Sequence, residues 1–258
     1  MRVIVVPGAF TAASAFQVMA ERLTTAGHDV TVVDLPARSS RLPQVLGGGL
    51  GRIDAMLDET IDEIAVDADD LVLVGHSLGG LACLRATQRR SAGPSPREGG
   101  RTPAALALLT PAPPGGLARE LLQLIGRDPV SALKFAALAV TSKTPPVADA
   151  IPPQGLFTDQ VTDDELRASM AHRRDESWRL LAQLVLGSRD RVEPLGIPTL
   201  VVGGTEDGLV PERTCADLAE RLGARYEVLP VGHAFAEEAA GDVVTDVLVD
   251  WLATVPDA

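Results

Sequence analysis

The sequence predicts an α/β fold, in which a doubly wound, mostly parallel sheet of about six strands is covered by helices on both faces. Apolar runs of strand length alternate with stretches of helical spacing along most of the 258 residues, and 46% of the residues are hydrophobic. A Gly-x-Ser-x-Gly segment at residues 75–79 lies between an apolar run and a helical stretch. These observations predict one large core with a sharp strand-to-helix turn built into it.

The first half of the chain supplies three expected strands and an amphipathic helix. Strands are predicted at residues 3–6 and 30–35, and a third at residues 71–74 leads directly into Ser77. Residues 51–66 are predicted to be helical, because their large apolar residues recur at a spacing that places them on one face of a helix.

The second half returns to the sheet after a polar, glycine- and proline-rich loop at residues 91–100. Strands are predicted at 106–109, 198–203 and 225–230, followed by a helix near 238–254. In such sheets ligands bind beyond the carboxyl ends of the strands, so we expect the functional residues at that edge.

Residues 111–195 interrupt the alternation and predict an inserted helical segment. Helical spacing is present at 117–125, 130–140 and 163–186, with proline pairs between the second and the third of these stretches. The sequence therefore divides into a core domain, residues 1–110 and 196–258, and an inserted helical cap, residues 111–195.

Composition limits the classes of partner and cofactor. A formal net charge of −12 gives no electrostatic footprint for nucleic acid or for an anionic membrane. No run of eighteen apolar residues is present to span a bilayer, and Pro7 interrupts the N-terminal apolar stretch, which argues against a signal peptide. Cys83 and Cys215 fall in separate expected helices and make no disulfide framework. We expect a cytoplasmic monomer or homodimer that binds a small molecule, with no metal and no cofactor.

The segment at residues 75–79 has the pattern of a nucleophile elbow. The turn is so tight that only residues with almost no side chain fit two positions before and after Ser77, and it raises the serine hydroxyl clear of the sheet. The helix that begins there directs unpaired N–H groups and a partial positive charge at the hydroxyl. Ser77 is therefore the candidate nucleophile.

Two later segments supply the other members of a Ser-His-Asp triad, in the chain order typical of such elbows. The strand at 198–203 leads to Asp207, and the strand at 225–230 leads to His233. Serine needs a base to take its proton, and the imidazole needs an acceptor that fixes its tautomer. We expect His233 to be the base and Asp207 the acceptor, with Glu206 as the alternative carboxylate.

Residues 7–11 predict an oxyanion-binding loop, because they follow the first strand at once. Two backbone N–H groups are expected to stabilise a tetrahedral oxyanion, one of them from the residue after the nucleophile, Leu78. The second is assigned to Ala9, with Phe10 as the alternative.

With these motifs the chain resembles the α/β-hydrolase superfamily, in the branch of small serine esterases that includes plant methylesterases, hydroxynitrile lyases and bacterial relatives. Gly8-Ala9 and Phe16 stand where that branch usually has His-Gly-Ala and then Trp, while residues 26–35 and 75–80 match its second strand and its elbow. The resemblance covers residues 1–110 and 196–256. Pro7 replaces the usual histidine, and the first two strands of larger members are absent.

The resemblance implies that the cap roofs the active site and selects the substrate. Candidate pocket residues in the cap are Phe135, Phe157, Met170 and Trp178, with His172 as a possible substrate ligand. Phe10 and His76 are the candidates from the core. The alternative for the apolar cap residues is that they pack on the main domain.

The predicted function is that of a serine hydrolase that cleaves an ester, lactone or thioester of a small to medium apolar acyl compound through an acyl-enzyme. One alternative keeps the fold and changes the reaction to that of a cyclase, lyase or decarboxylase in a biosynthetic pathway. Another is a hydrolase-like ligand receptor.

Overall fold

The computed structural model describes residues 1–34, 48–64, 70–92, 102–141, 153–188 and 190–256. Most of the predicted loop at 91–100 and all of the first predicted proline pair, Pro145 and Pro146, lie outside these residues.

The predicted parallel sheet is confirmed. Six strands lie in the order β2-β1-β3-β4-β5-β6, and every neighbouring pair is parallel. The strands are β1 (Arg2–Val6), β2 (Asp29–Val32), β3 (Leu71–His76), β4 (Ala105–Leu109), β5 (Thr199–Gly204) and β6 (Arg225–Leu229). The strands β3, β4 and β5 are buried along their whole length, as expected for a parallel sheet covered on both faces.

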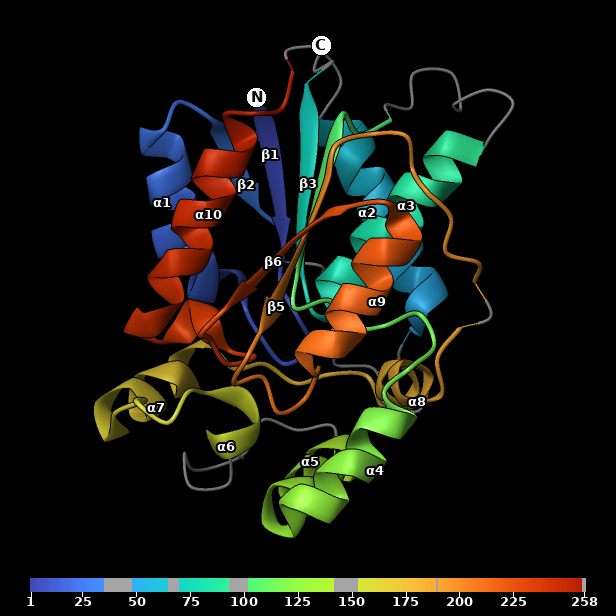
Figure 1. Ribbon diagram of the computed structural model, residues 1–258. Helices are drawn as coiled ribbons and strands as arrows, with labels where there is room; N and C mark the ends of the chain where they lie inside the picture. Colours follow the sequence, from blue (N-terminus) through green and yellow to red (C-terminus); the bar gives the residue numbers. More distant parts are fainter. Residues whose placement is uncertain (35–47, 65–69, 93–101, 142–152, 189, 257–258) are drawn as a thin grey trace.

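Helices cover both faces of the sheet (Figure 1). One face packs against α1 (Gln17–Thr25) and α10 (Asp242–Leu252). The opposite face packs against α2 (Leu50–Ile64), α3 (Leu78–Ala92) and α9 (Glu212–Leu222). Alternate residues of each central strand enter one or the other core, because successive side chains of a strand point to opposite faces.

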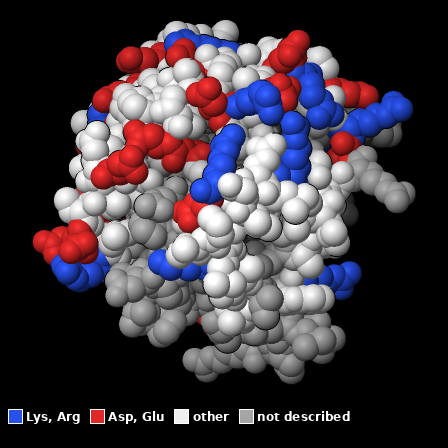
Figure 2. All heavy atoms as spheres, turned by 60° about the horizontal axis from the view of Figure 1, so that its bottom comes forward, with Lys and Arg blue, Asp and Glu red and all other residues white. Residues whose placement is uncertain are grey.

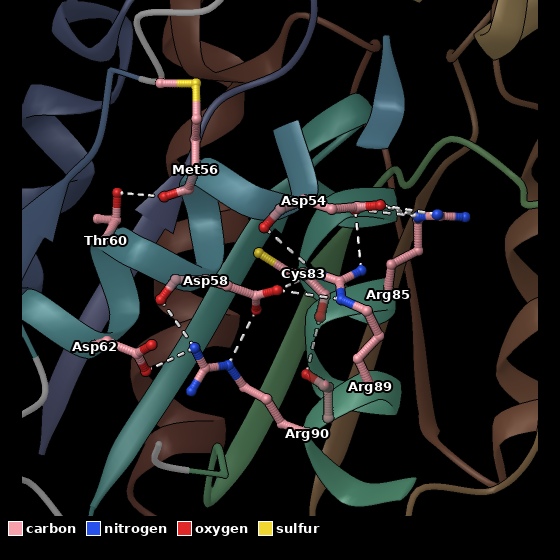
Figure 3. A network of polar contacts seen from close by, with 10 residues as sticks. Asp54, Met56, Asp58, Thr60, Asp62, Cys83, Arg85, Arg89 and Arg90 are labelled. Carbon is pink, nitrogen blue, oxygen red and sulfur yellow. Dashed lines mark hydrogen bonds and ion pairs between the residues drawn. The ribbon is translucent and has the colours of Figure 1, made fainter. Parts of the chain in front are cut away.

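An ion-pair network joins α2 to α3, the helix that begins at the predicted elbow (Figure 3). Acidic side chains one helical turn apart on α2 face arginines on α3. The network contains Asp54, Asp58 and Asp62 of α2 and Arg85, Arg89 and Arg90 of α3. Asp58 is shared, with Oδ2 3.0 Å from Arg89 Nη2 and Oδ1 3.1 Å from Arg90 Nε.

The insertion between β4 and β5 is helical, and most of its helices gather beyond the carboxyl ends of the strands (Figure 1). They are α4 (Ala118–Arg127), α5 (Pro129–Thr141), α6 (Pro153–Leu156), α7 (Asp163–Ser169) and α8 (Trp178–Leu186). Figure 2 brings this end of the molecule forward and shows charged side chains mainly in its upper half.

The single helix predicted at residues 163–186 is wrong, because the structure has two helices there. Thr162 begins α7 with a capping box completed by Glu165, and α7 gives way to a 3-10 turn at Met170–His172. Ser177 then caps α8 by accepting a hydrogen bond from the Leu180 amide. The polar run between the two helices remains non-helical.

Two segments near the ends of the insertion, residues 113–117 and 184–188, lie side by side and are hydrogen-bonded to each other; we call this pair of segments the neck. The Leu117 amide donates to the Leu184 carbonyl at 3.1 Å, and the Ser188 amide donates to the Pro114 carbonyl at 2.7 Å. Gly116 and Gly187 have φ angles of 82° and 77°, and a Cβ on Gly187 would lie 2.6 Å from the Gly116 nitrogen. Glycine at these positions allows the two backbones to touch.

Within the described residues, no helix is long and apolar enough to cross a membrane.

Candidate active site

The predicted elbow is present between β3 and α3. Ser77 has a φ of 50°, in the left-handed region of backbone conformation that residues other than glycine rarely adopt. A Cβ on Gly75 would lie 2.5 Å from the Gly79 carbonyl oxygen, and one on Gly79 would collide with the Val6 carbonyl. The glycines therefore allow the turn to close against β1, and the closed turn holds Ser77 in its strained conformation.

The structure brings Ser77, His233 and Asp207 into one hydrogen-bonded chain. His233 Nε2 lies 2.9 Å from Ser77 Oγ, and His233 Nδ1 lies 2.7 Å from Asp207 Oδ2. Asp207 Oδ1 accepts from the amides of Leu209 at 2.8 Å and Val210 at 2.7 Å. These amides fix the carboxylate, so the imidazole is oriented toward the serine.

Glu206, the alternative carboxylate, is directed elsewhere. Its Oε2 accepts from the Asp159 amide at 3.1 Å. Asp207 is therefore the carboxylate that contacts His233.

His76 supports the loop that carries His233. Its Nε2 donates to the His233 carbonyl oxygen at 2.8 Å. Its ring packs against Phe16 and Phe235, with centroid distances of 5.5 Å and 5.2 Å. Because the acceptor is a carbonyl, Nε2 carries the proton, and His76 holds the backbone of the loop that carries His233.

The predicted oxyanion loop follows β1 and pairs with the insertion. The Ala12 amide donates to the His172 carbonyl at 2.8 Å, and the Arg174 amide donates to the Phe10 carbonyl at 3.1 Å. An antiparallel bridge joins Thr11 to Arg173. Phe10 has a φ of 59°, so the loop turns sharply beside Ser77. The Leu78 amide opens α3, where the first amides have no intrahelical acceptor.

Ser77 and His233 lie in the wall of a cavity. Ala9 and three of the predicted pocket residues, Phe10, His76 and Phe135, also line it. Sequence reasoning missed most of the remaining wall, which is largely apolar: Leu117, Leu121, Leu156, Leu181, Leu184, Val185 and Leu209. The spacing of Leu117, the N-cap of α4, and Leu121 and that of Leu181 and Leu184 on α8 were visible in the sequence as apolar helix faces, but the surface they pack against was not.

Four predicted pocket residues do not line the cavity. Phe157 is 1% exposed and packs in a separate small cluster with Met170. His172 lies outside the cavity, with Nδ1 2.8 Å from the hydroxyl of Ser14. Trp178 is 55% exposed at the start of α8. The spacing of apolar residues predicts that a helix has an apolar face, but it does not show which surface that face packs against.

A buried ion pair beside the triad was also missed. The guanidinium of Arg173 donates to Glu237, and the two side chains are 6% and 2% exposed. Burial raises the pKa of Glu237 to about 7, against the opposing effect of the Arg173 charge. Arg173 also lines the cavity, which makes it a charged group in an otherwise mostly apolar wall.

No cluster of three or more His, Cys, Asp or Glu side chains suited to a metal ion occurs in the part of the chain that the structure describes. Both cysteines are buried and unbonded to each other, and burial raises the pKa of each thiol.

The parallel sheet and the serine on a tight turn after β3 define an α/β-hydrolase fold. A model of the alpha/beta hydrolase family matches residues 3–247, and the chain belongs to that family.

Solved structures show the same fold over nearly the whole chain. A thermophilic esterase from Thermogutta terrifontis is 19% identical to this chain with a TM-score of 0.70. The match covers 99% of this chain and 90% of the esterase chain. The Arabidopsis methylesterase MES16 is 17% identical with a TM-score of 0.67, covering 98% and 99%. A monoacylglycerol lipase from Paleococcus ferrophilus is 19% identical with a TM-score of 0.67, covering 99% and 95%. No curated protein matches the chain by sequence.

Proposed function

We propose that the protein is a serine hydrolase that cleaves an ester, lactone or thioester of a small to medium apolar acyl compound. The observation that carries the proposal is the hydrogen-bonded chain from Ser77 through His233 to Asp207 in the wall of a mostly apolar cavity. The esterase and lipase neighbours in the structure comparison support hydrolase activity as the general class.

In the proposed mechanism Ser77 Oγ attacks the carbonyl carbon while His233 Nε2 takes the hydroxyl proton. The amides of Leu78 and Ala9 stabilise the oxyanion. Collapse of the intermediate breaks the bond to the leaving group, which receives the proton from His233. Water then attacks the acyl-enzyme with His233 as base, which releases the acid and restores Ser77.

The cavity supports a limit on substrate size. Its volume is about 120 Å³, below the several hundred Å³ typical of sites for drug-sized ligands. Residues 111–195 are proposed as the cap, since Leu117, Leu121 and Leu181 of this segment line the cavity beside Ser77. Short acyl chains should therefore be preferred.

The test is labelling by a fluorophosphonate probe, together with turnover of p-nitrophenyl esters from acetate to octanoate. Ser77→Ala should abolish labelling and lower kcat/KM roughly 10⁴-fold or more. The matched control is Ser14→Ala, because Ser14 also contacts a histidine nitrogen, at 2.8 Å, but lies outside the cavity. Undiminished labelling of Ser77→Ala would refute the mechanism.

If the wild type is labelled but does not turn over the esters, Ser77 is a competent nucleophile but the protein does not hydrolyse these substrates. That result would favour the cyclase, lyase or decarboxylase alternative, or a ligand receptor, over a hydrolase.

A further inference from the structure

Arg173 is a buried cation in the wall of the same cavity that contains Ser77 and His233. Its side chain is 6% exposed, and most of the other lining residues are apolar. Burying a charged group is costly unless its polar atoms find partners. The partners of this guanidinium therefore indicate what the cavity is built to hold.

The protein satisfies only part of the guanidinium. Nη2 donates to Glu237, and Cζ lies 6.0 Å from the centroid of the Phe157 ring. Nε is buried without a hydrogen-bond partner. Within the described chain Nη1 has no hydrogen-bond partner either, but unlike Nε it is not fully buried. Arg173 lines the cavity, so we infer that Nη1 is the atom available to a ligand there.

Backbone pairing fixes Arg173 relative to the oxyanion loop. The residue forms the antiparallel bridge with Thr11, and the hydrogen bonds on either side of the bridge join Ala12 to His172 and Arg174 to Phe10. The backbone of Arg173 is thus fixed relative to the oxyanion loop, and the hydrogen bond to Glu237 holds the guanidinium, which lowers the entropic cost of binding.

We propose that Arg173 determines specificity by binding a neutral oxygen acceptor, such as a ketone or second ester carbonyl, on the acyl chain of the substrate. The proposal rests on the hydrolase function proposed above. When Glu237 is ionised it balances the charge of Arg173, so a substrate carboxylate would then bring an uncompensated negative charge into a mostly apolar cavity. A carbonyl oxygen can accept a charge-assisted hydrogen bond without adding charge.

The experiment compares kcat/KM for p-nitrophenyl hexanoate with that for its 4-oxo and 5-oxo derivatives. The p-nitrophenyl monoester of glutaric acid, which carries a carboxylate in place of the 5-oxo terminus, is the charged comparison. We expect the wild type to prefer at least one oxo ester over the plain ester by about tenfold, because a site built to hydrogen-bond a substrate group discriminates against the analogue that lacks it.

The variant is the double replacement Arg173→Met with Glu237→Gln, which leaves no unpaired buried charge. Its oxo-to-plain ratio should fall to about one. The matched control is Arg174→Met, since Arg174 pairs with Asp34 and does not line the cavity. The control should keep the wild-type ratio. Because the ratio compares substrates within one protein, a general loss of activity cancels.

Three results would overturn the proposal: no oxo preference in the wild type, a preference retained in the double variant, or selection of the glutarate ester over both oxo esters. If the wild type hydrolyses none of the esters, the proposed function fails separately. In that case calorimetric binding of hexanamide, 4-oxohexanamide and 5-oxohexanamide to Ser77→Ala decides the role of Arg173. Tighter binding of an oxo amide than of hexanamide, lost when the double replacement is added, supports the proposed role of Arg173. Equal binding of the oxo amides and hexanamide refutes that role.

Discussion

At the scale of single residues, the candidate site depends on a few exact contacts around His233. Asp207 gives one oxygen to the imidazole and the other to two backbone amides, so its position does not depend on the histidine. His76 holds the backbone on the other side of the ring. His233 is therefore oriented before substrate binds, which is what the proposed proton transfer from Ser77 requires.

Asp207→Asn tests this orientation. The amide preserves the shape of the side chain but disfavours the histidine tautomer that accepts the serine proton, so kcat should fall by about 10⁴-fold with little change in KM. Steady-state kinetics with a p-nitrophenyl ester would measure it. Glu206→Gln, the neighbouring control, should stay within a few-fold of wild type. Equal losses in the two variants would contradict the assignment of Asp207.

Glu237 predicts a pH dependence of stability. Burial raises its pKa to about 7 from a usual value near 4.5, while Arg173 and His233 lower it and Glu238 raises it. Between these values the folded state binds more protons than the unfolded state, so the stability of the fold decreases as the pH rises from about 5 to 7. Glu237→Gln should remove up to about 3 kcal/mol of that decrease.

Urea unfolding at pH 5 and pH 8 would measure the change for the wild type and the variant. Glu220→Gln, at an exposed position on α9, is the control and should leave the pH dependence unchanged. An identical pH dependence in the wild type and Glu237→Gln would refute the effect.

At the scale of elements, α3 connects the candidate site to the rest of the core. It begins directly after Ser77, and it carries the arginines that pair with α2. The pairs are only partly exposed, and Asp58 contacts two arginines at once. The network thus anchors the helix whose first turn supplies the Leu78 amide.

Asp58→Ala should lower the free energy of unfolding by about 1 kcal/mol, because it leaves Arg89 and Arg90 each without one of their partners. Asp163→Ala is the matched control. Asp163 pairs with Arg167 at a site where the two side chains are 86% and 65% exposed, so the loss should stay below about 0.5 kcal/mol. Denaturant unfolding of both variants compares them. An Asp58 effect no larger than the Asp163 effect would show that the network adds nothing.

The sequence predicted the strands and the three members of the proposed triad for a common reason. Ser77, Asp207 and His233 each follow a predicted strand, and the parallel sheet brings the carboxyl ends of these strands to one edge. Local pattern therefore placed them. Arg173 could not be found in this way, because its position comes from pairing with Thr11, far away in the chain. Trp178 was predicted to line the pocket but is exposed, because helical spacing does not reveal which face of α8 remains uncovered.

At the scale of the whole molecule, the cavity is assembled from two parts of the chain that meet at the neck. Core loops supply Ser77 and His233, and the insertion supplies the leucines opposite them. Leu184 and Val185 belong both to the neck and to the cavity wall. Packing at the neck should therefore affect both stability and catalysis.

Gly187→Ala tests this coupling against Gly196→Ala. Both glycines have positive φ, 77° and 69°, but only Gly187 lies against another backbone, whereas a Cβ on Gly196 would meet nothing within 4 Å. Gly196→Ala should cost only the backbone strain, about 1 kcal/mol. Gly187→Ala should cost more and should also lower kcat/KM, as measured by thermal unfolding and ester turnover. Equal effects on both measurements would contradict the coupling.

The pairing at the neck also has an evolutionary consequence. Because residues 113–117 and 184–188 are hydrogen-bonded to each other, the polypeptide leaves and re-enters the core at one point, while β4 and β5 remain neighbours in the sheet. The entropic cost of a longer loop between fixed ends grows slowly with its length. Insertions and deletions between the two sides of the neck should therefore cost little chain entropy, provided that the contacts of this segment with residues 10–12 are kept.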